Sequence, residues 1–237
     1  MLTAVTEIRP YRPGDRAGLG NVCIRTAAAG EDATGDYVDP SILPEIFAAP
    51  YAVLEPDLAF VVEDDGEVVG YVLGTADTPT FVRRFREEWL PVVGASHPPP
   101  TGEPASPDEL MAYLLHHPER MLVPEVVAWP AHVHIDLLPP YQRRGLGRGL
   151  METFVAALRK AGVPVLHLSM LSANVRARAF HDRLGFEVLE VPGTGELTYL
   201  GLRVAARRAE TTDRFMETVH RTANQLSVVH VDREAWR

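Results

Sequence analysis

The feature that most constrains the fold is a regular alternation of strands and helices in the second half of the chain. Short apolar runs rich in Val, Ile and Leu are separated by longer segments with apolar residues at helical spacing. Two parallel strands in one sheet need a crossover connection, which is usually a helix, so this order predicts a parallel strand pair within an α/β sheet. The predicted elements are a strand at 131–138, a helix at 145–161, a strand at 165–170, a helix at 173–184, and strands from Phe186 and at 197–204.

The first half of the chain predicts additional strands and an inserted segment. A strand is expected at 5–9 and a helix at 16–28, with Asp15 suited to the N-cap position. Two β-rich runs flank Asp64–Glu67, and an Asp-Gly turn between such runs predicts a hairpin. Residues 76–130 are rich in proline, and we interpret them as a helical insertion before the fourth strand. The helices predicted within it are at 81–89 and 107–116.

Composition excludes several classes of protein. Among 237 residues, 23 Lys and Arg stand against 32 Asp and Glu, a formal charge of −9, so there is no overall positive field for a nucleic acid or an anionic membrane. No apolar run long enough for a membrane span and no signal-peptide pattern occurs, and we expect a cytoplasmic protein with neither kind of partner. The single cysteine, Cys23, supplies no intramolecular disulfide and no cysteine cluster, and we predict no metal site.

A loop rich in glycine and arginine connects the strand at 131–138 to the helix that follows it. Its sequence, QRRGLG, places successive backbone N–H groups and the positive end of a helix dipole where an anion can bind. Arg143, Arg144 and Arg148 add positive charge to an otherwise acidic protein. The glycine spacing does not fit the dinucleotide fingerprint, and the Lys-Ser/Thr pair of a Walker loop is absent. The loop therefore predicts a pyrophosphate site of another type.

Two segments in this region resemble a known family. The string HVHIDLLPPYQRRGLGRGLM, with Q-x-x-G-x-G at its centre, and the later string NVRARAFHDRLGFEVL resemble, in order and spacing, the signature segments of the GNAT superfamily of acyl-CoA-dependent N-acetyltransferases. Other strings, among them EIRPYRPGD and EPDLAFVVEDDGEVVGYVLGTADT, are similar to the acetyltransferase-like domain at the C-terminus of animal O-GlcNAcases. The resemblance covers about residues 7–204.

The resemblance implies an α/β fold of the GNAT type, with a mixed, twisted sheet of about six or seven strands and helices on both faces. We expect one domain over 1–204, with the insertion at about 76–130. The tail at 205–237 has apolar residues at helical spacing and is predicted to form a docking or dimerisation helix. A homodimer is therefore one expectation for the assembly of this protein.

The resemblance also implies acetyl-CoA as co-substrate and assigns residues to it. The loop and the first helical turn would bind the pyrophosphate, and backbone N–H groups at the strand end would bind the thioester oxygen and the pantetheine. An asparagine and a nearby aromatic side chain would contact the pantetheine arm. These residues are Gln142, Arg143, Arg144, Gly145, Leu146, Gly147 and Arg148 in the loop and first turn, Leu137 and Leu138 at the strand end, and Asn174 and Phe180.

Three polar residues alternate along the strand before the loop and supply candidates for a catalytic base. His132, His134 and Asp136 share one face of that strand, because side chains in a strand alternate in direction. We predict Asp136 as the first choice of base and His134 as the second, unless a β-bulge reverses the alternation or the three side chains only satisfy one another. Many members of the family place a tyrosine general acid where this chain has His181, so His181 is the candidate acid.

Two classes of function remain open. One is an N-acetyltransferase that transfers acetyl from acetyl-CoA to a primary amine, on a small molecule or a protein, by direct attack in a ternary complex. The other is a protein that binds acetyl-CoA as a sensor or interaction module without turnover. An acidic loop, with Glu31, Asp32, Asp36 and Asp39, either attracts a cationic amine or is a solvated surface.

Overall fold

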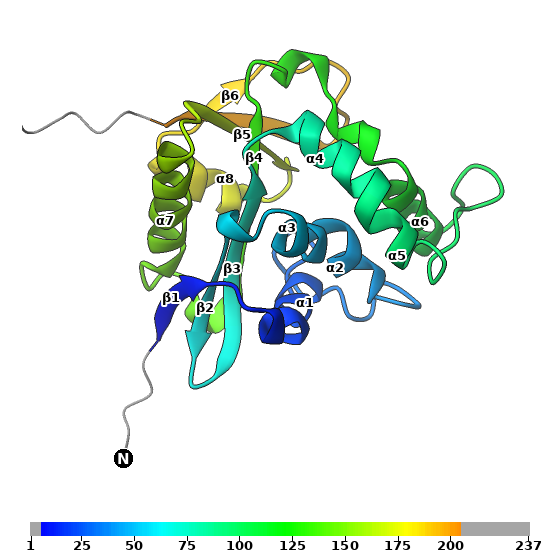
Figure 1. The fold of residues 1–237 in the computed structure, drawn as a ribbon, viewed down its shortest axis with the longest axis horizontal. Coiled ribbons are helices and arrows are strands. Elements are labelled where there is room, and N and C mark those ends of the chain that lie inside the picture. The colour runs from blue at the N-terminus through cyan, green and yellow to red at the C-terminus, as the bar shows by residue number, and fades with distance from the viewer. Residues whose placement is uncertain (1–5, 205–237) are drawn as a thin grey trace, which may run out of the picture. The chain divides into compact units, whose positions relative to one another are not determined.

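The computed structural model describes residues 6–204, and its central element is a seven-stranded mixed sheet (Figure 1). The strand order is β1-β2-β3-β4-β5-β7-β6. Within the described residues β4 and β5 are the one parallel pair, as predicted, and the other neighbours are antiparallel. The strands are β1 (Glu7–Pro10), β2 (Ala59–Asp64), β3 (Glu67–Thr75), β4 (Ala131–Leu137), β5 (Val165–Leu171), β6 (Glu187–Leu189) and β7 (Leu197–Arg203).

Helices cover both faces of the sheet (Figure 1). α7 packs on β2, β3 and β4 from one side, and α1 and α3 pack on β3 from the other. α7 presents apolar side chains at helical spacing to the sheet, so that Leu150, Phe154 and Leu158 are buried. The helices outside the insertion are α1 (Arg16–Ile24), α2 (Ile42–Phe47), α3 (Ala49–Leu54), α7 (Leu146–Lys160) and α8 (Val175–Arg183).

The insertion between β3 and β4 is helical, as predicted. Its first helix begins earlier than expected, because Asp77 accepts a hydrogen bond from the Thr80 N–H (2.9 Å) and Pro79 fits the first turn. The N–H of Thr78 donates to the Pro130 oxygen (2.8 Å), which ties the start of this helix to the start of β4. The helical segments are α4 (Thr78–Arg84), a π-helical turn (Phe85–Trp89), α5 (Leu90–Val93) and α6 (Pro107–His116).

The helix predicted at 16–28 is shorter in the structure. After the end of α1 the chain turns through Ala29 and Gly30, both of which have positive φ (54° and 94°). α1 ends at Ile24 because the N–H groups of Thr26 and Ala27 donate to oxygens three residues back, on Cys23 and Ile24, instead of four. The left-handed residues that follow prevent the helix from resuming. Asp15 occupies the N-cap position, but its carboxylate binds the Arg9 guanidinium at 2.7 and 2.8 Å instead of capping α1.

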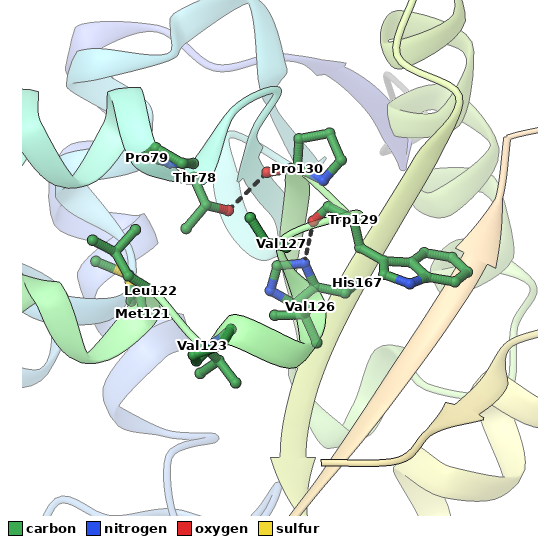
Figure 2. Close-up of a pocket in the computed structure, with 11 residues that line it drawn as sticks. Thr78, Pro79, Met121, Leu122, Val123, Val126, Val127, Trp129, Pro130 and His167 are labelled. Carbon is green, nitrogen blue, oxygen red and sulfur yellow. Dashed lines mark hydrogen bonds between the residues drawn. The ribbon is translucent and has the colours of Figure 1, made fainter.

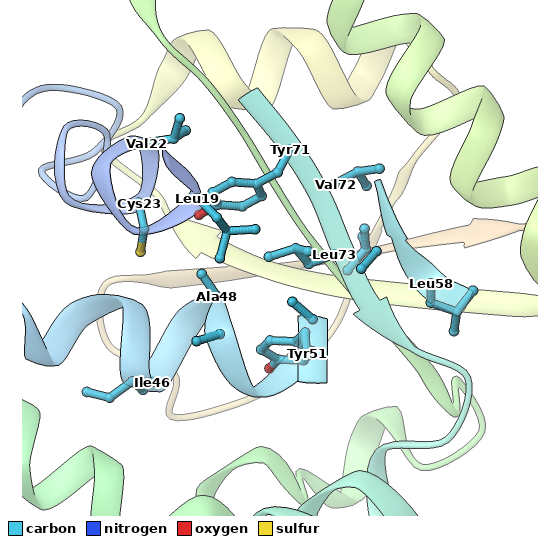
Figure 3. Close-up of a cluster of buried hydrophobic side chains, with 14 of the residues drawn as sticks. Leu19, Val22, Cys23, Ile46, Ala48, Tyr51, Leu58, Tyr71, Val72 and Leu73 are labelled. Atoms are coloured by element: carbon cyan, nitrogen blue, oxygen red, sulfur yellow. The ribbon is translucent and has the colours of Figure 1, made fainter. Parts of the chain in front are cut away.

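Part of the hydrophobic core lies between β3 and the helices α1 to α3 (Figure 3). Leu19 and Val22 on α1, and Leu73 on β3, are among its buried side chains. Each side chain of this kind contributes roughly 1.5–3 kcal/mol by removing apolar surface from water. The hydroxyl groups of Tyr51 and Tyr71 also enter this core, and each needs a hydrogen-bond partner there. Both find that partner on the polar face of β4.

Some expectations concern parts of the protein that the structure does not describe. The predicted tail helix, and the dimer it would form, involve residues 205–237, which lie outside the described residues. Within residues 6–204, no helix is both long and apolar enough to cross a membrane. The same residues contain no group of three or more His, Cys, Asp or Glu side chains placed to hold a metal ion.

Gly74 on β3 provides a test of how α7 packs on the sheet. A Cβ at this position would overlap the carbonyl oxygen of His132 and lie 2.5 Å from Cζ of Phe154. We expect Gly74→Ala to lower the free energy of unfolding by about 3 kcal/mol, because the strand or the helix must move. Gly14→Ala is the control, since a Cβ there has no heavy atom within 4 Å. Urea unfolding measures the difference, and equal midpoints for the two variants would contradict this packing.

Candidate active site

β4 and β5 are paired only where they begin. Ala131 pairs with Leu166 and His132 with His167, after which the two strands separate. Each strand keeps its other neighbour along its length, β4 with β3 and β5 with β7. A cavity of about 920 Å³ lies where they separate. It is lined by the end of β4, the loop after it, the start of α7, the length of α8 and the turn after α1. The backbone of β4 on this side therefore faces the cavity instead of a strand.

The loop after β4 enters α7 through backbone conformations that few residues adopt. Arg143 and Gly145 have positive φ (61° and 85°), and α7 starts directly afterwards without a side-chain cap. The first hydrogen bond joins the Gly149 N–H to the Gly145 oxygen (3.0 Å). The N–H groups of the first turn have no partner among the described residues and can bind a ligand, as the anion-site prediction requires. Gln142 steadies the loop by donating to the Leu137 oxygen (2.9 Å).

The predicted loop residues divide into two groups by position. The guanidinium of Arg144 lies 5.3 Å from the ring centre of Tyr141, outside the cavity, and Leu146 packs against the core. Charge and sequence position alone therefore do not decide which of these side chains reach the cavity. The residues that do line it are Gln142, Arg143, Gly145, Gly147 and Arg148.

α8 forms another wall of the cavity along its length. Asn174 caps this helix by accepting from the Ala177 N–H (3.0 Å), which leaves its amide nitrogen available to a ligand. The ring of Phe180 approaches α7 so closely that a Cβ on Gly147 would lie 3.2 Å from it. The structure thus brings Asn174 and Phe180 together with the loop, as the resemblance implied.

The backbone at the end of β4 differs from the prediction in one respect. Leu138 is buried and its N–H donates to the Val69 oxygen (3.0 Å), so the expectation that this N–H faces the cavity is wrong. Hydrogen bonds alternate along an antiparallel strand, so the residues between those bonded to β3 direct their backbone to the other side. Ile135 and Leu137 are in this position, and both line the cavity. Sequence reasoning missed Ile135 because the register between β3 and β4 is not visible in a single sequence.

Asp136 is the member of the polar face that reaches the cavity. The Tyr71 hydroxyl donates to its Oδ2 (2.7 Å), and Asp136 and Thr26 both line the cavity. No bulge interrupts the register of β4 with β3, so the predicted alternation along β4 is confirmed. Burial raises the pKa of Asp136 to about 6, and hydrogen bonds from Tyr71 and Thr26 partly oppose that rise. Such a carboxyl is ionised at neutral pH and is basic enough to accept a proton.

The two histidines on the same face of β4 do not line the cavity. Nε2 of His134 lies 3.0 Å from the Tyr51 hydroxyl oxygen, and Nε2 of His132 lies 2.8 Å from the same atom. Burial is the main cause that lowers the pKa of His134 to about 4, and the charge of Arg120 adds to it. Both histidines belong to a buried polar cluster, so Asp136 is better placed than His134 to act as a base in the cavity.

His181 lies in the cavity wall but is almost fully buried, with 4% of its surface exposed. Its ring is 5.1 Å from the rings of Phe180 and Phe186, and neither of its nitrogens has a hydrogen-bond partner among the described residues. Burial lowers the pKa of His181 to about 4, although the Ala177 backbone and the Asp182 carboxylate act in the opposite direction. The ring is therefore neutral at pH 7 and does not carry the proton of an imidazolium.

The acidic loop after α1 is engaged in local contacts. Asp32 and Asp39 each accept hydrogen bonds from a hydroxyl and an N–H within the same loop. Glu31 forms an ion pair with Arg176 (3.0 Å), a residue that lines the cavity. These contacts favour a structural role for the loop over the attraction of a cationic amine.

Comparison with known proteins identifies the family. A profile described as "Acetyltransferase (GNAT) family" matches residues 30–186, which include β4, the loop after it, α7 and α8. The chain belongs to the GNAT acetyltransferase family. The seven-stranded mixed sheet is accordingly a GNAT fold, and the predicted fold class is confirmed.

Individual GNAT proteins and one longer protein resemble the chain to different extents. Protein O-GlcNAcase of Rattus norvegicus is 24% identical over 194 residues, which are 80% of this chain and 21% of that protein, so the chain spans about a fifth of the relative's length. The [Ribosomal protein bS18]-alanine N-acetyltransferase of Escherichia coli strain K12 is 46% identical over 53 residues, 22% of this chain and 36% of that enzyme. The crystal structure of SsHAT is 58% identical with a TM-score of 0.82, and the match covers 84% of this chain and 98% of SsHAT.

The hydrogen bond between Tyr71 and Asp136 leads to a testable pKa. The hydroxyl stabilises the carboxylate, so we expect Tyr71→Phe to raise the pKa of Asp136 above its value of about 6. NMR titration of carbon-13-labelled aspartate carboxyls measures this pKa, and Asp136→Asn identifies the signal. Tyr141→Phe is the matched control, because it removes a tyrosine–aspartate hydrogen bond elsewhere, to Asp64 (2.9 Å). A pKa that stays the same or falls in Tyr71→Phe would contradict the assignment.

Proposed function

We propose that this protein is an N-acetyltransferase, which transfers the acetyl group of acetyl-CoA to a primary amine by direct attack while both substrates are bound. The observation that carries this proposal is a cavity in which the uncapped start of α7 and the free backbone edge of β4 meet the carboxyl of Asp136. Membership of the GNAT acetyltransferase family supports it. We further propose residues 1–204 as the acetyltransferase domain and the cytoplasm as its location, the latter on composition.

The residues of the cavity fit coenzyme A. A diphosphate needs hydrogen-bond donors and positive charge, and the start of α7 supplies both through its free N–H groups and through Arg143 and Arg148. Gly145 and Gly147 leave the backbone open to close approach, and a volume of about 920 Å³ suits a large ligand. Asn174 would contact the pantetheine arm. When bound, acetyl-CoA supplies the acetyl group in activated form, as a thioester.

The free edge of β4 is suited to stabilise negative charge on an oxygen. Ile135 and Leu137 direct their backbone groups into the cavity because β5 has separated from β4 at this point. Backbone N–H groups held by a sheet do not have to reorganise during a reaction, which makes them effective donors to an oxyanion. His181 lies in the wall of the same cavity, but both of its ring nitrogens are buried, so it is not assigned a donor role.

Asp136 is the residue that would hold the proton released by the amine. Tyr71 orients its carboxyl, and the pKa of about 6 keeps it ionised at neutral pH. Transfer forms the nitrogen–carbon bond and breaks the carbon–sulfur bond of the thioester, so the proton that leaves nitrogen must end on the departing sulfur. The Asp136 carboxylate can accept that proton, directly or through a water molecule, before it passes to the thiolate. An acceptor that arrives as an ammonium ion releases one further proton to solvent. His134, the second candidate, would need to act from outside the cavity lining.

The amine acceptor is a small molecule or a protein. Two relatives show the range by their names, since one acts on the alanine of a ribosomal protein and a Drosophila melanogaster polyamine N-acetyltransferase forms N-acetylagmatine. The latter is 17% identical with a TM-score of 0.52, over 84% of this chain and all of that chain, and shares the fold. A panel of an alanine-starting peptide, a lysine peptide, agmatine and an amino sugar, analysed by mass spectrometry, tests transfer. Binding of acetyl-CoA without transfer to any of them would favour a sensor or interaction module.

Substitution of Asp136 tests the proposed base. We expect Asp136→Asn to lower kcat about 100-fold or more with acetyl-CoA affinity unchanged, because an amide cannot accept the proton. In the wild-type protein the base must be ionised, so kcat/KM should rise with pH up to about 6 and level off above it. Asp65→Asn, in the β2–β3 turn, is the control. Full activity of Asp136→Asn would remove this residue from the mechanism.

Substitution of Gly147 tests the site for coenzyme A. A side chain at this position meets the Phe180 ring and enters the space between α7 and α8, so we expect Gly147→Val to weaken acetyl-CoA binding at least about tenfold. Gly102→Val is the control, because a Cβ there has no heavy atom within 4 Å. Isothermal titration calorimetry measures both affinities. Equal affinities would refute the assignment of the loop.

A further inference from the structure

A chain of four hydrogen bonds crosses the core from the insertion to β4. It begins at the Pro130 oxygen, which lies 2.7 Å from Oγ1 of Thr78 (Figure 2). The same Oγ1 lies 2.7 Å from Nδ1 of His132. The chain continues from Nε2 of His132 to the Tyr51 hydroxyl (2.8 Å), and from that hydroxyl to Nε2 of His134 (3.0 Å). The four side chains, Thr78, His132, Tyr51 and His134, are referred to below as the relay.

The first contact fixes the direction of each proton in the relay. Two oxygens at 2.7 Å need a proton between them, and a carbonyl oxygen has none, so Thr78 donates to Pro130. The hydroxyl proton is then used, and Nδ1–H of His132 must donate to Oγ1. Nε2 of His132 consequently carries a lone pair and accepts from the Tyr51 hydroxyl. The oxygen of Tyr51 in turn accepts from Nε2–H of His134.

The reverse direction would leave one contact without a proton. If Thr78 donated to His132, the oxygens of Thr78 and Pro130 would face each other at 2.7 Å with lone pairs only. Sδ of Met121 lies 3.6 Å from the Tyr51 hydroxyl and is a weaker acceptor than the imidazole nitrogen at 2.8 Å. Hydrogen-bond donation along the relay therefore has one favoured direction, from His134 towards Pro130.

Both histidines of the relay are neutral at physiological pH, so each carries a single N–H. Burial is the main cause that lowers the pKa of His132 well below its usual value and the pKa of His134 to about 4. The charges of Arg120 and His167 lower both pKa values further, and that of His134 also lowers the pKa of His132. Thr78 and His132 are themselves buried, which shields their hydrogen bonds from competing water.

Nδ1 of His134 remains available to a ligand. No described residue forms a hydrogen bond with Nδ1 of His134. Polar atoms without a partner that are fully buried are known among the described residues, and Nδ1 is not one of them, so solvent can reach it. His134 also shares its face of β4 with Asp136, two residues along the strand, and Asp136 lines the cavity. Because Nε2 carries the proton, Nδ1 presents a lone pair.

We propose that the relay holds His134 as the Nε2–H tautomer, so that its Nδ1 accepts a hydrogen bond from the ammonium group of the acceptor substrate. The identity of this ligand rests on the proposed function, whereas the tautomer rests on the hydrogen-bond geometry alone. An ammonium group has only donors, so a fixed lone pair near Asp136 favours its binding and an N–H at the same place would oppose it. Thr78, His132 and Tyr51 are accordingly positioning residues that act through His134.

Nitrogen-15 NMR of the full chain with labelled histidine reads the tautomers directly, because protonated and unprotonated ring nitrogens resonate far apart. At pH 7 we expect Nδ1–H for His132 and Nε2–H for His134. Signals are assigned by their loss in His132→Asn and His134→Asn. The opposite tautomers in the wild-type protein would overturn the proposal without any reference to activity.

Thr78→Val and Thr78→Ser form a matched pair. Valine has the shape of threonine but no hydroxyl, so His132 loses the acceptor of its Nδ1–H and the relay should reverse, which leaves His134 with Nδ1–H. Serine keeps the hydroxyl and should keep the wild-type tautomers. An unchanged His134 spectrum in Thr78→Val would show that the relay does not set the tautomer. If Thr78→Val does not fold, Tyr51→Phe cuts the relay next to His134, and a His134 spectrum identical to wild type would overturn the proposal in the same way.

Kinetics test the role of Nδ1 in amine binding, with whichever amine of the panel is acetylated fastest. In Thr78→Val we expect KM for the amine to rise about tenfold, the effect of one lost hydrogen bond, with acetyl-CoA affinity unchanged by calorimetry. Thr78→Ser should restore the wild-type KM. An unchanged KM in a variant with a reversed tautomer would overturn the role of Nδ1. If the wild-type protein acetylates no amine, the proposed function and this role both fail, whereas the spectra still decide the tautomer.

Discussion

The site depends on the early separation of β4 from β5. The two strands pair at two positions only, and each is held in place by its other neighbour, so the separation is stable without further contacts between them. It leaves Ile135 and Leu137 with backbone groups directed into a cavity and makes room for a ligand beside them. The loop at the end of β4 leads into α7 at the same cavity. The free N–H groups of that helix and those of the strand therefore line one cavity.

Burial acts on the polar face of β4 in opposite directions for acids and bases. It raises the pKa of Asp136 to about 6 and lowers that of His134 to about 4, since the charged form is penalised in both cases. At neutral pH the face therefore holds one carboxylate near the cavity and two neutral rings further along the strand. Two core tyrosines provide hydrogen-bond partners for these groups: Tyr71 donates to Asp136, and the Tyr51 hydroxyl contacts both histidines. The structural explanation of the three residues thus applies to His132 and His134, whereas Asp136 lines the cavity and remains the proposed base.

Elements set by neighbouring residues were predictable, and those set by distant contacts were less so. The β2–β3 hairpin follows from its Asp-Gly turn, and α6 lies at the residues predicted for the second helix of the insertion. The helix expected at 16–28 is longer than α1, because helical propensity does not reveal the change to hydrogen bonds three residues back after Ile24. The N–H of Leu138 was assigned to the ligand, although the register with β3 commits it to Val69. The lowered pKa of His181 depends on its burial beside Phe186, which a single sequence does not show.

The sequence by itself determined the α/β order, the parallel strand pair, the glycine-containing loop at a helix start, and the alternation of His132, His134 and Asp136. These features depend on the spacing of residues that are close along the chain, which a single sequence displays. Tertiary structure alone decided that Asp136 reaches the cavity, that Ile135 has a free backbone, and that His134 is tied to the distant Thr78 through Tyr51. Register, burial and hydrogen-bond partners come from segments far apart in the chain, and their effects on proton positions arise only when the core has assembled.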